Sequence, residues 1–127
     1  MQFNIATLAL RLSFGLSMAL AHGLPKLMNF AEMSPGFADP LGIGPVPSMA
    51  FVVFAEFFCA LLVAFGVLTR YSAIPVIIVM AVACFHIHGG ADWGTREASF
   101  LFGIAFLAMS LLGSGRFSLD YLVFKKR

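Results

Sequence analysis

Long apolar segments with few charged side chains make up most of the chain, and short polar connections separate them. A helix needs about 20 apolar residues to cross the hydrocarbon core of a bilayer. Four segments approach or reach that length, at about residues 5–28, 47–68, 71–88 and 97–112. The pattern therefore predicts an all-α fold, a transmembrane four-helix bundle formed by a single domain over residues 1–127.

The connection between the first two segments is rich in glycine and proline. Such a stretch, from about residue 29 to residue 46, does not form regular helix. It nevertheless carries apolar side chains, namely Met33, Phe37, Leu41, Ile43 and Val46. We expect an ordered interfacial or re-entrant loop that covers one mouth of the bundle, since irregular backbone at this depth must lie against protein or water. An ordinary exposed connector is the alternative for its first half.

Composition agrees with a membrane protein. Hydrophobic residues make up 61% of the chain and charged residues 11%, whereas soluble domains are about 45–50% apolar. The first segment lacks a basic leader and a clean cleavage site, so we expect a retained helix rather than a signal peptide. A net charge of +2 with no basic patch gives no reason to expect nucleic acid as a partner. Cys59 and Cys84 lie apart in apolar segments, which argues against a dithiol enzyme.

The basic residues predict an orientation. With four crossings, the N-terminus, the tight Thr69-Arg70 connection and the C-terminal tail lie on one side, which carries Arg70, Arg116, Lys125, Lys126 and Arg127. The other side carries most of the acidic residues. Because positive charge accumulates in cytoplasmic loops, both termini are predicted to be cytoplasmic.

Two charged side chains interrupt apolar segments. Glu56 lies near the middle of the second segment and Arg11 lies in the first. A charge at the centre of a membrane costs about 2.5 kcal/mol or more on insertion scales, so it needs a partner or a wet cavity. Depths estimated from the helical rise differ by only about 5–8 Å. We therefore predict an ion pair between Arg11 and Glu56; the alternative is that Arg11 extends to the cytoplasmic interface.

Further polar side chains gather near the expected outer face. At 100° per residue one face of the first helix carries Arg11, Gly15, Met18, His22 and Lys26. The third helix adds His86 or His88, and Glu97 begins the fourth. Trp93, in the preceding connection, is either an interfacial anchor or a lid over a polar cavity.

Histidines and carboxylates could ligate zinc, copper or iron in principle. No helix carries the Glu-x-x-His spacing of bundle di-metal sites. We therefore expect no metal site.

Several short sequence elements follow one another in a particular order along the chain. They are Arg11 with Gly15, His22-Gly23-x-x-Lys26, Asp39-Pro40-Leu41-Gly42-Ile43-Gly44, Ala55-Glu56, Gly66-x-x-Thr69-Arg70, His86, Glu97 and Ser118-Leu119-Asp120. Together they resemble the DoxX family of small four-helix membrane proteins. The resemblance implies a multi-pass protein of the bacterial inner membrane that is linked to redox chemistry, in some relatives to thiosulfate:quinone oxidoreduction. Relatives with paired cysteines differ from this chain, so a redox role here would require a quinone, a small substrate or a partner subunit.

Two functions from different classes follow. In the first, the chain is a quinone-linked redox subunit with a polar cavity near the outer face. The catalytic candidates are then Glu56 as proton acceptor and His22 or His86 as the group that exchanges the proton with the outer surface. The groups expected to bind the substrate or cofactor are Arg11, Lys26, Trp93 and Glu97.

In the second, the chain is a non-enzymatic assembly or binding subunit whose polar groups fix helix register. Its partners would be other subunits or further copies of itself, which the phenylalanine-rich surface could support. A small-solute carrier is less favoured, because the chain shows no obvious inverted repeat.

Overall fold

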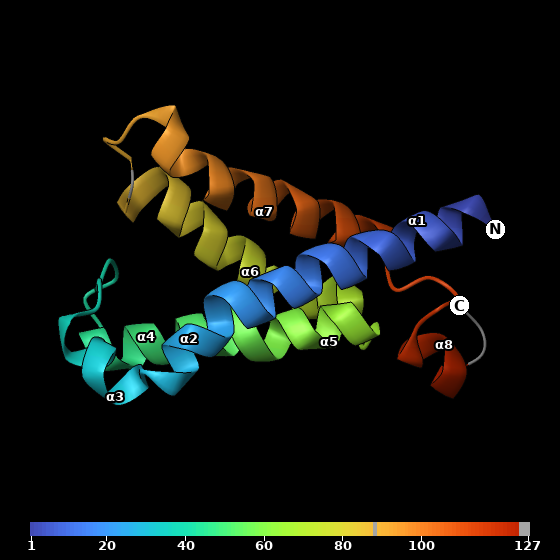
Figure 1. Cartoon of the computed structure of the whole chain (residues 1–127), viewed down its shortest axis with the longest axis horizontal. Helices are drawn as coiled ribbons and strands as arrows, with labels where there is room; N and C mark the ends of the chain where they lie inside the picture. The colour runs from blue at the N-terminus through green and yellow to red at the C-terminus, as the bar shows by residue number, and fades with distance from the viewer. Residues whose placement is uncertain (88, 125–127) are drawn as a thin grey trace.

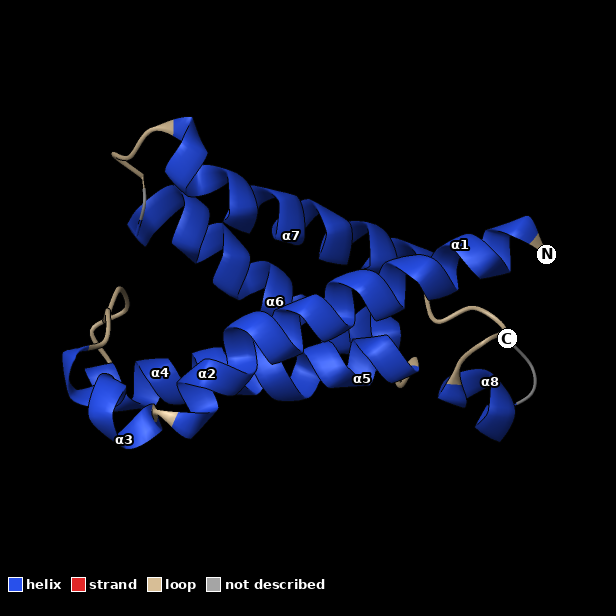
Figure 2. Ribbon diagram, viewed as in Figure 1, coloured by secondary structure: helices blue, strands red, loops and turns tan. Residues whose placement is uncertain are grey.

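The computed structural model describes residues 1–87 and 89–124 and contains no strand in that part of the chain (Figure 2). Within these described residues, four helices are long and apolar enough to cross a membrane, namely Gln2–Met28, Pro45–Phe65, Thr69–Ile87 and Trp93–Leu112. The predicted all-α, four-helix transmembrane architecture is confirmed. His88 and the basic tail at 125–127 lie outside the described residues.

Each of the first three long helices contains π-helical turns. The first comprises α1 (Gln2–Leu10), η1 (Arg11–Gly15), η2 (Met18–Gly23) and α2 (Leu24–Met28). The second comprises α4 (Pro45–Val53), η4 (Phe54–Cys59) and α5 (Ala60–Phe65). The third comprises α6 (Thr69–Val82) and η5 (Ala83–Ile87). The fourth is α7 (Trp93–Leu112), and the short α8 (Leu119–Phe124) follows it.

Glycines hold the first two long helices close together. A Cβ atom added to Gly15 would lie 2.9 Å from the Cβ of Ala64. A Cβ atom added to Gly23 would lie 2.6 Å from the backbone carbonyl of Glu56. Small residues at such positions allow two helix backbones to approach closely in a membrane. The two contacts also fix the antiparallel register, because each pairs one position on the first helix with one on the second.

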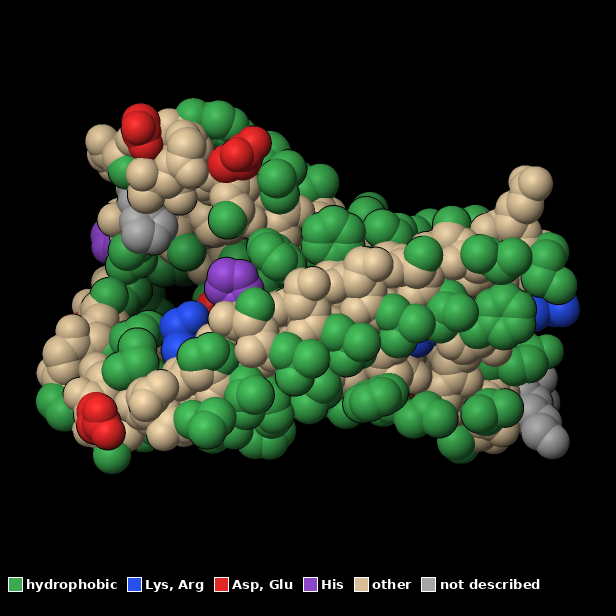
Figure 3. Space-filling view, in the orientation of Figure 1, with side chains coloured by type: hydrophobic (Ala, Val, Ile, Leu, Met, Phe, Trp, Pro, Cys, Tyr) green, Lys and Arg blue, Asp and Glu red, His purple; other side chains and the backbone are tan. Residues whose placement is uncertain are grey.

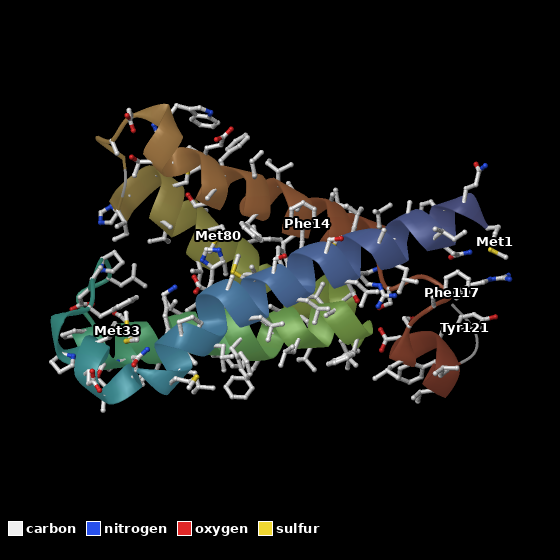
Figure 4. The ribbon with its side chains drawn as sticks, in the orientation of Figure 1. Met1, Phe14, Met33, Met80, Phe117 and Tyr121 are labelled. Atoms are coloured by element: carbon white, nitrogen blue, oxygen red, sulfur yellow. The ribbon has the colours of Figure 1, made fainter. Side chains whose placement is uncertain are left out.

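The third and fourth long helices form a second antiparallel pair. Gly103 of α7 lies against the side chain of Met80 of α6. Figure 1 shows this pair meeting the first pair near the chain termini and diverging from it toward the opposite end (Figure 1). Where the pairs meet, Phe14 packs edge-on against Phe102, with ring centroids 5.7 Å apart, and Figure 4 shows Phe14 and Met80 in this region (Figure 4).

The Gly/Pro-rich connection is partly helical, which corrects the expectation of wholly irregular backbone. It contains α3 (Phe30–Met33) and the 3-10 turn η3 (Ser34–Gly36). The residues of α3 precede the first proline of the loop, so nothing breaks that turn. Pro45 is already the first residue of α4, where its missing N–H costs no hydrogen bond.

Asp39 holds the second half of this connection onto the start of α4. Its carboxylate accepts hydrogen bonds from the backbone N–H of Ile43 (3.0 Å) and Gly44 (2.8 Å) and from the hydroxyl of Ser48 (2.9 Å). The loop therefore folds back over the end of the second long helix.

The predicted helix boundaries differ from the observed ones by up to four residues, and two of the differences move named residues. The fourth helix begins at Trp93 rather than Glu97, because the Asp92 carboxylate accepts hydrogen bonds from the backbone N–H (3.2 Å) and the hydroxyl (2.8 Å) of Thr95. Trp93 thus lies in the first turn of α7 and not in a connection. The third helix begins at Thr69 rather than at residue 71, so Pro75 lies inside α6 instead of in its first turn.

Candidate functional site

The carboxylate of Glu56 pairs with the ammonium of Lys26. The Nζ atom of Lys26 lies 2.7 Å from Oε1 of Glu56. The side chain of Glu56 is 6% exposed and that of Lys26 is 22% exposed. Lys26 Nζ also donates to the backbone carbonyl of His22, at 3.4 Å. The predicted Arg11–Glu56 pair is therefore wrong.

The register of the first two long helices explains why Glu56 pairs with Lys26 and not with Arg11. Gly23 contacts Glu56 directly, and Lys26 lies nearly one turn beyond Gly23, so its side chain reaches the carboxylate. Arg11 precedes Gly23 by twelve positions, which corresponds to roughly 18 Å along a helix. The depth estimate relied on the thickness of a bilayer, whereas the actual level of each charge depends on which residues of the two helices touch.

Arg11 instead joins the first helix to the C-terminal segment. Its Nη1 donates to the carbonyl of Ala64 at 3.1 Å, and its Nη2 donates to the carbonyl of Phe117. The residue is only 1% exposed, so it does not extend to the interface. Gly66 makes room for the guanidinium by adopting a φ of +75° with no Cβ. Arg11 lies at the end of the bundle opposite Glu56, and we assign it a structural role.

A pocket of about 330 Å³ contains the Lys26–Glu56 pair. Its walls come from α2, the Gly/Pro-rich loop, α4, η4, α6 and η5, and they are mainly apolar. The lining consists of Lys26, Phe37, Ala38, Pro40, Leu41, Ile43, Ser48, Phe51, Val52, Glu56, Ile78, Val79, Val82, Ala83 and Ile87. Figure 3 shows basic, acidic and histidine side chains gathered at a hollow on this side of the molecule (Figure 3). The expected polar cavity is thus an apolar pocket with one ion pair in its wall.

The other predicted site residues lie outside this lining. His22 is half-buried beside Lys26, and its ring packs against Phe102 with centroids 5.4 Å apart. His86, Trp93 and Glu97 are exposed. The structure therefore brings Lys26, Glu56 and the backbone of His22 together, and it does not place His86, Trp93 or Glu97 around one shared chamber.

The sequence predicted a loop with Phe37, Leu41 and Ile43 over one mouth of the bundle, but it did not reveal that Ser48 and the apolar side chains of α6 complete the pocket walls. Phe51 and Ser48 lie three residues apart near the start of α4, and both line the pocket. No local pattern marked the contact between Asp39 and Ser48, because the N-cap of α4 is Gly44 and Asp39 lies five residues before it.

The candidate polar residues coincide with π-helical turns. Glu56 lies in η4, His22 in η2, Arg11 in η1 and His86 in η5. Such turns are rare and often mark functional positions in helices. A π-turn also shifts the side chains after it from the 100° spacing, which adds to the difficulty of predicting contacts from a helical wheel.

No group of three or more His, Cys, Asp or Glu side chains able to hold a metal ion occurs among residues 1–87 and 89–124. The pocket thus offers two ionic groups and a hydroxyl to a ligand, with hydrocarbon around them.

The chain matches a known protein family. The profile of the DoxX family matches residues 6–89, which include every residue that lines the pocket. The chain belongs to the DoxX family. This confirms the resemblance drawn from the short sequence elements.

Curated relatives of this DoxX chain are uncharacterized. One, from Haemophilus influenzae, is 30% identical over 76% of this chain and 67% of the relative. Another, an uncharacterized membrane protein from Mycobacterium tuberculosis, is 32% identical over 95% of this chain and 83% of the relative. No solved structure shows a significant match. Together with the four apolar helices, these findings identify the DoxX chain as an integral membrane protein.

Proposed function

We propose that this DoxX protein is an inner-membrane subunit linked to redox chemistry, which binds a quinone or a similar small lipophilic reductant in the pocket beneath the Gly/Pro-rich loop. The observation that carries the proposal is a buried ion pair set in the wall of an otherwise apolar pocket. Small-molecule sites are typically apolar hollows of about 300–1,000 Å³ with a few placed polar groups. The pocket has this composition and a volume near the lower end of that range.

Lys26 can donate a hydrogen bond to a quinone, and Glu56 can accept a proton from a quinol. An ammonium has three N–H donors, of which Lys26 directs one at Glu56 and one at the carbonyl of His22. The third is free to donate to a quinone carbonyl. A quinol that becomes a quinone releases two protons and two electrons. The carboxylate of Glu56 would accept the two protons one after the other and pass each on before the next is taken, and the two electrons would pass to a partner redox subunit.

His22 is the best placed group to exchange these protons with the outer surface. It lies half-buried next to Lys26, and an imidazole can accept a proton on one ring nitrogen and donate one from the other. His86 is exposed outside the pocket lining, so the proposal gives it no direct contact with the ligand.

The walls favour a ligand that arrives from lipid. Phe51, Leu41 and Ile78 line the pocket and are also exposed on the surface of the bundle. An apolar ring with a tail could therefore enter from the bilayer with its polar head toward Lys26. A charged, water-soluble substrate would find few partners along that path.

The test is purification in mild detergent, extraction of bound quinone and titration of the emptied protein with a short-chain quinol under reducing conditions. We expect Glu56→Gln to weaken quinol binding about tenfold, since the quinol hydroxyl donates to the charged carboxylate and hydrogen bonds to charged groups contribute about 1.5–3 kcal/mol. Glu97→Gln is the matched control, because Glu97 is exposed outside the lining. Equal binding by the Glu56→Gln and Glu97→Gln proteins, or a wild-type protein that binds no quinone, would contradict the proposal.

The second candidate is a non-enzymatic assembly subunit. The observation that favours it is that Lys26 and Glu56 already satisfy each other, so the pair needs no ligand. In that case the protein would purify without quinone but together with a partner subunit or as a homo-oligomer.

A further inference from the structure

A second pocket lies at the opposite end of the bundle, next to the start of α1. Its volume is about 380 Å³. It forms where the start of α1, the turn before α6 and the segment after α7 meet. Its polar lining consists of Asn4, Thr69, Arg70, Ser114, Arg116 and Asp120. The pocket is separate from the proposed quinone site, and no step of that proposal uses it.

Two guanidinium groups from different elements give this pocket a positive charge. Arg70 donates from Nη1 to the carbonyl of Leu111 at 3.0 Å, which holds its guanidinium beside Gly113. Arg116 lies over the ring of Tyr121, 5.8 Å from the centroid. In the described part of the chain neither arginine has a carboxylate within ion-pair distance. Both therefore keep N–H groups for an external anion.

Asp120 does not neutralise the arginines. Its Oδ2 accepts hydrogen bonds from the backbone N–H of Leu68 and from the hydroxyl of Ser114, each at 2.8 Å. These donors tie the carboxylate to the turn before α6 and to the segment after α7. With two cations and one carboxylate engaged in this way, the pocket carries a net positive charge.

The rim of the pocket has the character of a membrane interface. Phe3, Leu68 and Tyr71 line it and are exposed. Aromatic side chains at helix ends lie typically at headgroup depth. Basic pockets between membrane helices on the cytoplasmic side bind anionic headgroups. The combination of guanidinium groups with an apolar rim fits a phosphate attached to acyl chains better than it fits a free anion.

We propose that this pocket binds the phosphate of an anionic phospholipid. Arg70 and Arg116 contact the phosphate oxygens, a pairing for which the planar guanidinium is well suited. The acyl chains lie along Phe3 and Tyr71. The bound lipid bridges the amino-terminal helix and the segment after α7, and so stabilises the closed end of the bundle.

The experiment measures binding of phosphatidylglycerol and phosphatidylcholine to the full-length protein by native mass spectrometry, with thermal stability as a second readout. Wild-type protein should prefer phosphatidylglycerol. The double variant Arg70→Gln/Arg116→Gln should lose that preference, with about a fivefold weaker affinity for each arginine removed. Arg96→Gln is the matched control, because Arg96 donates to the carbonyl of Cys84 at the other end of the bundle. It should bind phosphatidylglycerol like the wild type.

Additional variants keep the test decisive. Arg116→Gln alone removes only a guanidinium that lies over Tyr121, and it should still show the fivefold loss if the double variant does not fold. A chain that ends at residue 124 should keep the preference. The proposal is overturned if both arginine variants still prefer phosphatidylglycerol over phosphatidylcholine. It is also overturned if Arg96→Gln abolishes this preference, or if the chain that ends at residue 124 no longer shows it. Equal stabilisation by inorganic phosphate alone would assign the pocket to a free anion and also overturn it.

Discussion

At the scale of single residues, two charges within apolar helices have different fates. Glu56 meets Lys26 in the wall of a pocket, whereas Arg11 donates to carbonyl groups and closes the other end of the bundle. A charge in a membrane protein can thus be satisfied by an opposite charge or by backbone dipoles. Of these two residues, only Glu56 lines a pocket that a ligand can enter.

The Lys26–Glu56 pair should contribute measurably to stability. Removing one partner of a buried pair costs about 3–5 kcal/mol, because the other charge stays buried alone. Since Lys26 remains 22% exposed, we expect Lys26→Met to destabilise the protein by about 2–3 kcal/mol. Equilibrium unfolding in mixed micelles of mild detergent and SDS measures this loss. The double variant Lys26→Met/Glu56→Gln should recover part of it, and a Lys26→Met protein as stable as the wild type would exclude a stabilising pair.

Asp39 makes the loop over the pocket sensitive to acid. Desolvation raises the pKa of its carboxyl, but hydrogen bonds from Ser48 and from the backbone of Gly44, Ile43 and Gly42 outweigh it and bring the pKa below its usual value of 3.8. A carboxylate with a depressed native pKa stabilises the fold above its unfolded pKa, and this contribution is lost as the pH falls through the native value. The loop should therefore be closed at pH 7 and loosen below about pH 4.

Hydrogen exchange of the amides of Ile43 and Gly44, corrected for intrinsic rates, measures this loosening. Asp39→Asn should raise their exchange at pH 7 and remove most of its pH dependence. Asp92→Asn serves as the control, because Asp92 caps α7 and makes no contact with the loop in the described structure. If acid leaves the exchange of both amides unchanged, Asp39 does not hold the loop.

At the scale of elements, the close contact of the first two long helices depends on Gly23. An added methyl group would meet the backbone of Glu56 at 2.6 Å, so the helices must separate. We expect Gly23→Ala to destabilise the protein by about 1–3 kcal/mol, as overpacking does in cores, and to weaken the Lys26–Glu56 contact. Thermal unfolding in detergent reports the change. Gly36→Ala is the control, since no atom lies within 4 Å of its added Cβ, and an equal loss in both variants would contradict this account.

The elements also show what the sequence could and could not predict. The second helix was expected at 47–68 and lies at Pro45–Phe65. This span was predictable because the length of an apolar segment is enough to identify a membrane helix. The start of α7 was missed, because it depends on the cap that Asp92 provides. The burial of Glu56 was predictable from its apolar neighbours. Its partner was not, since that follows from the glycine contacts between two helices, and the pocket walls follow from the packing of several elements that no local pattern encodes.

At the scale of the whole molecule, the bundle has two unlike ends. The start of α1, α8, the turn before α6 and the arginine-lined pocket lie at one end, and the Gly/Pro-rich loop and the ion-pair pocket lie at the other (Figure 1). A chain that crosses the membrane four times begins and ends on the same side, which agrees with α8 lying at the same end of the bundle as the start of α1. The proposed headgroup site and the proposed quinone site would then face opposite surfaces of the membrane.

The orientation of those two ends is itself a prediction. Arg70 and Arg116 lie at the end of the termini, and basic residues favour the cytoplasm. In a chain whose native cysteines are replaced (Cys59→Ala/Cys84→Ala), a membrane-impermeant maleimide should therefore label Gly36→Cys in intact cells. It should label Leu122→Cys only after the membrane is permeabilised. Both positions are exposed, so access and not burial decides the result. Labelling of Leu122→Cys from outside, with Gly36→Cys protected, would reverse the topology; the ion-pair pocket would then open toward the cytoplasm and exchange its protons there.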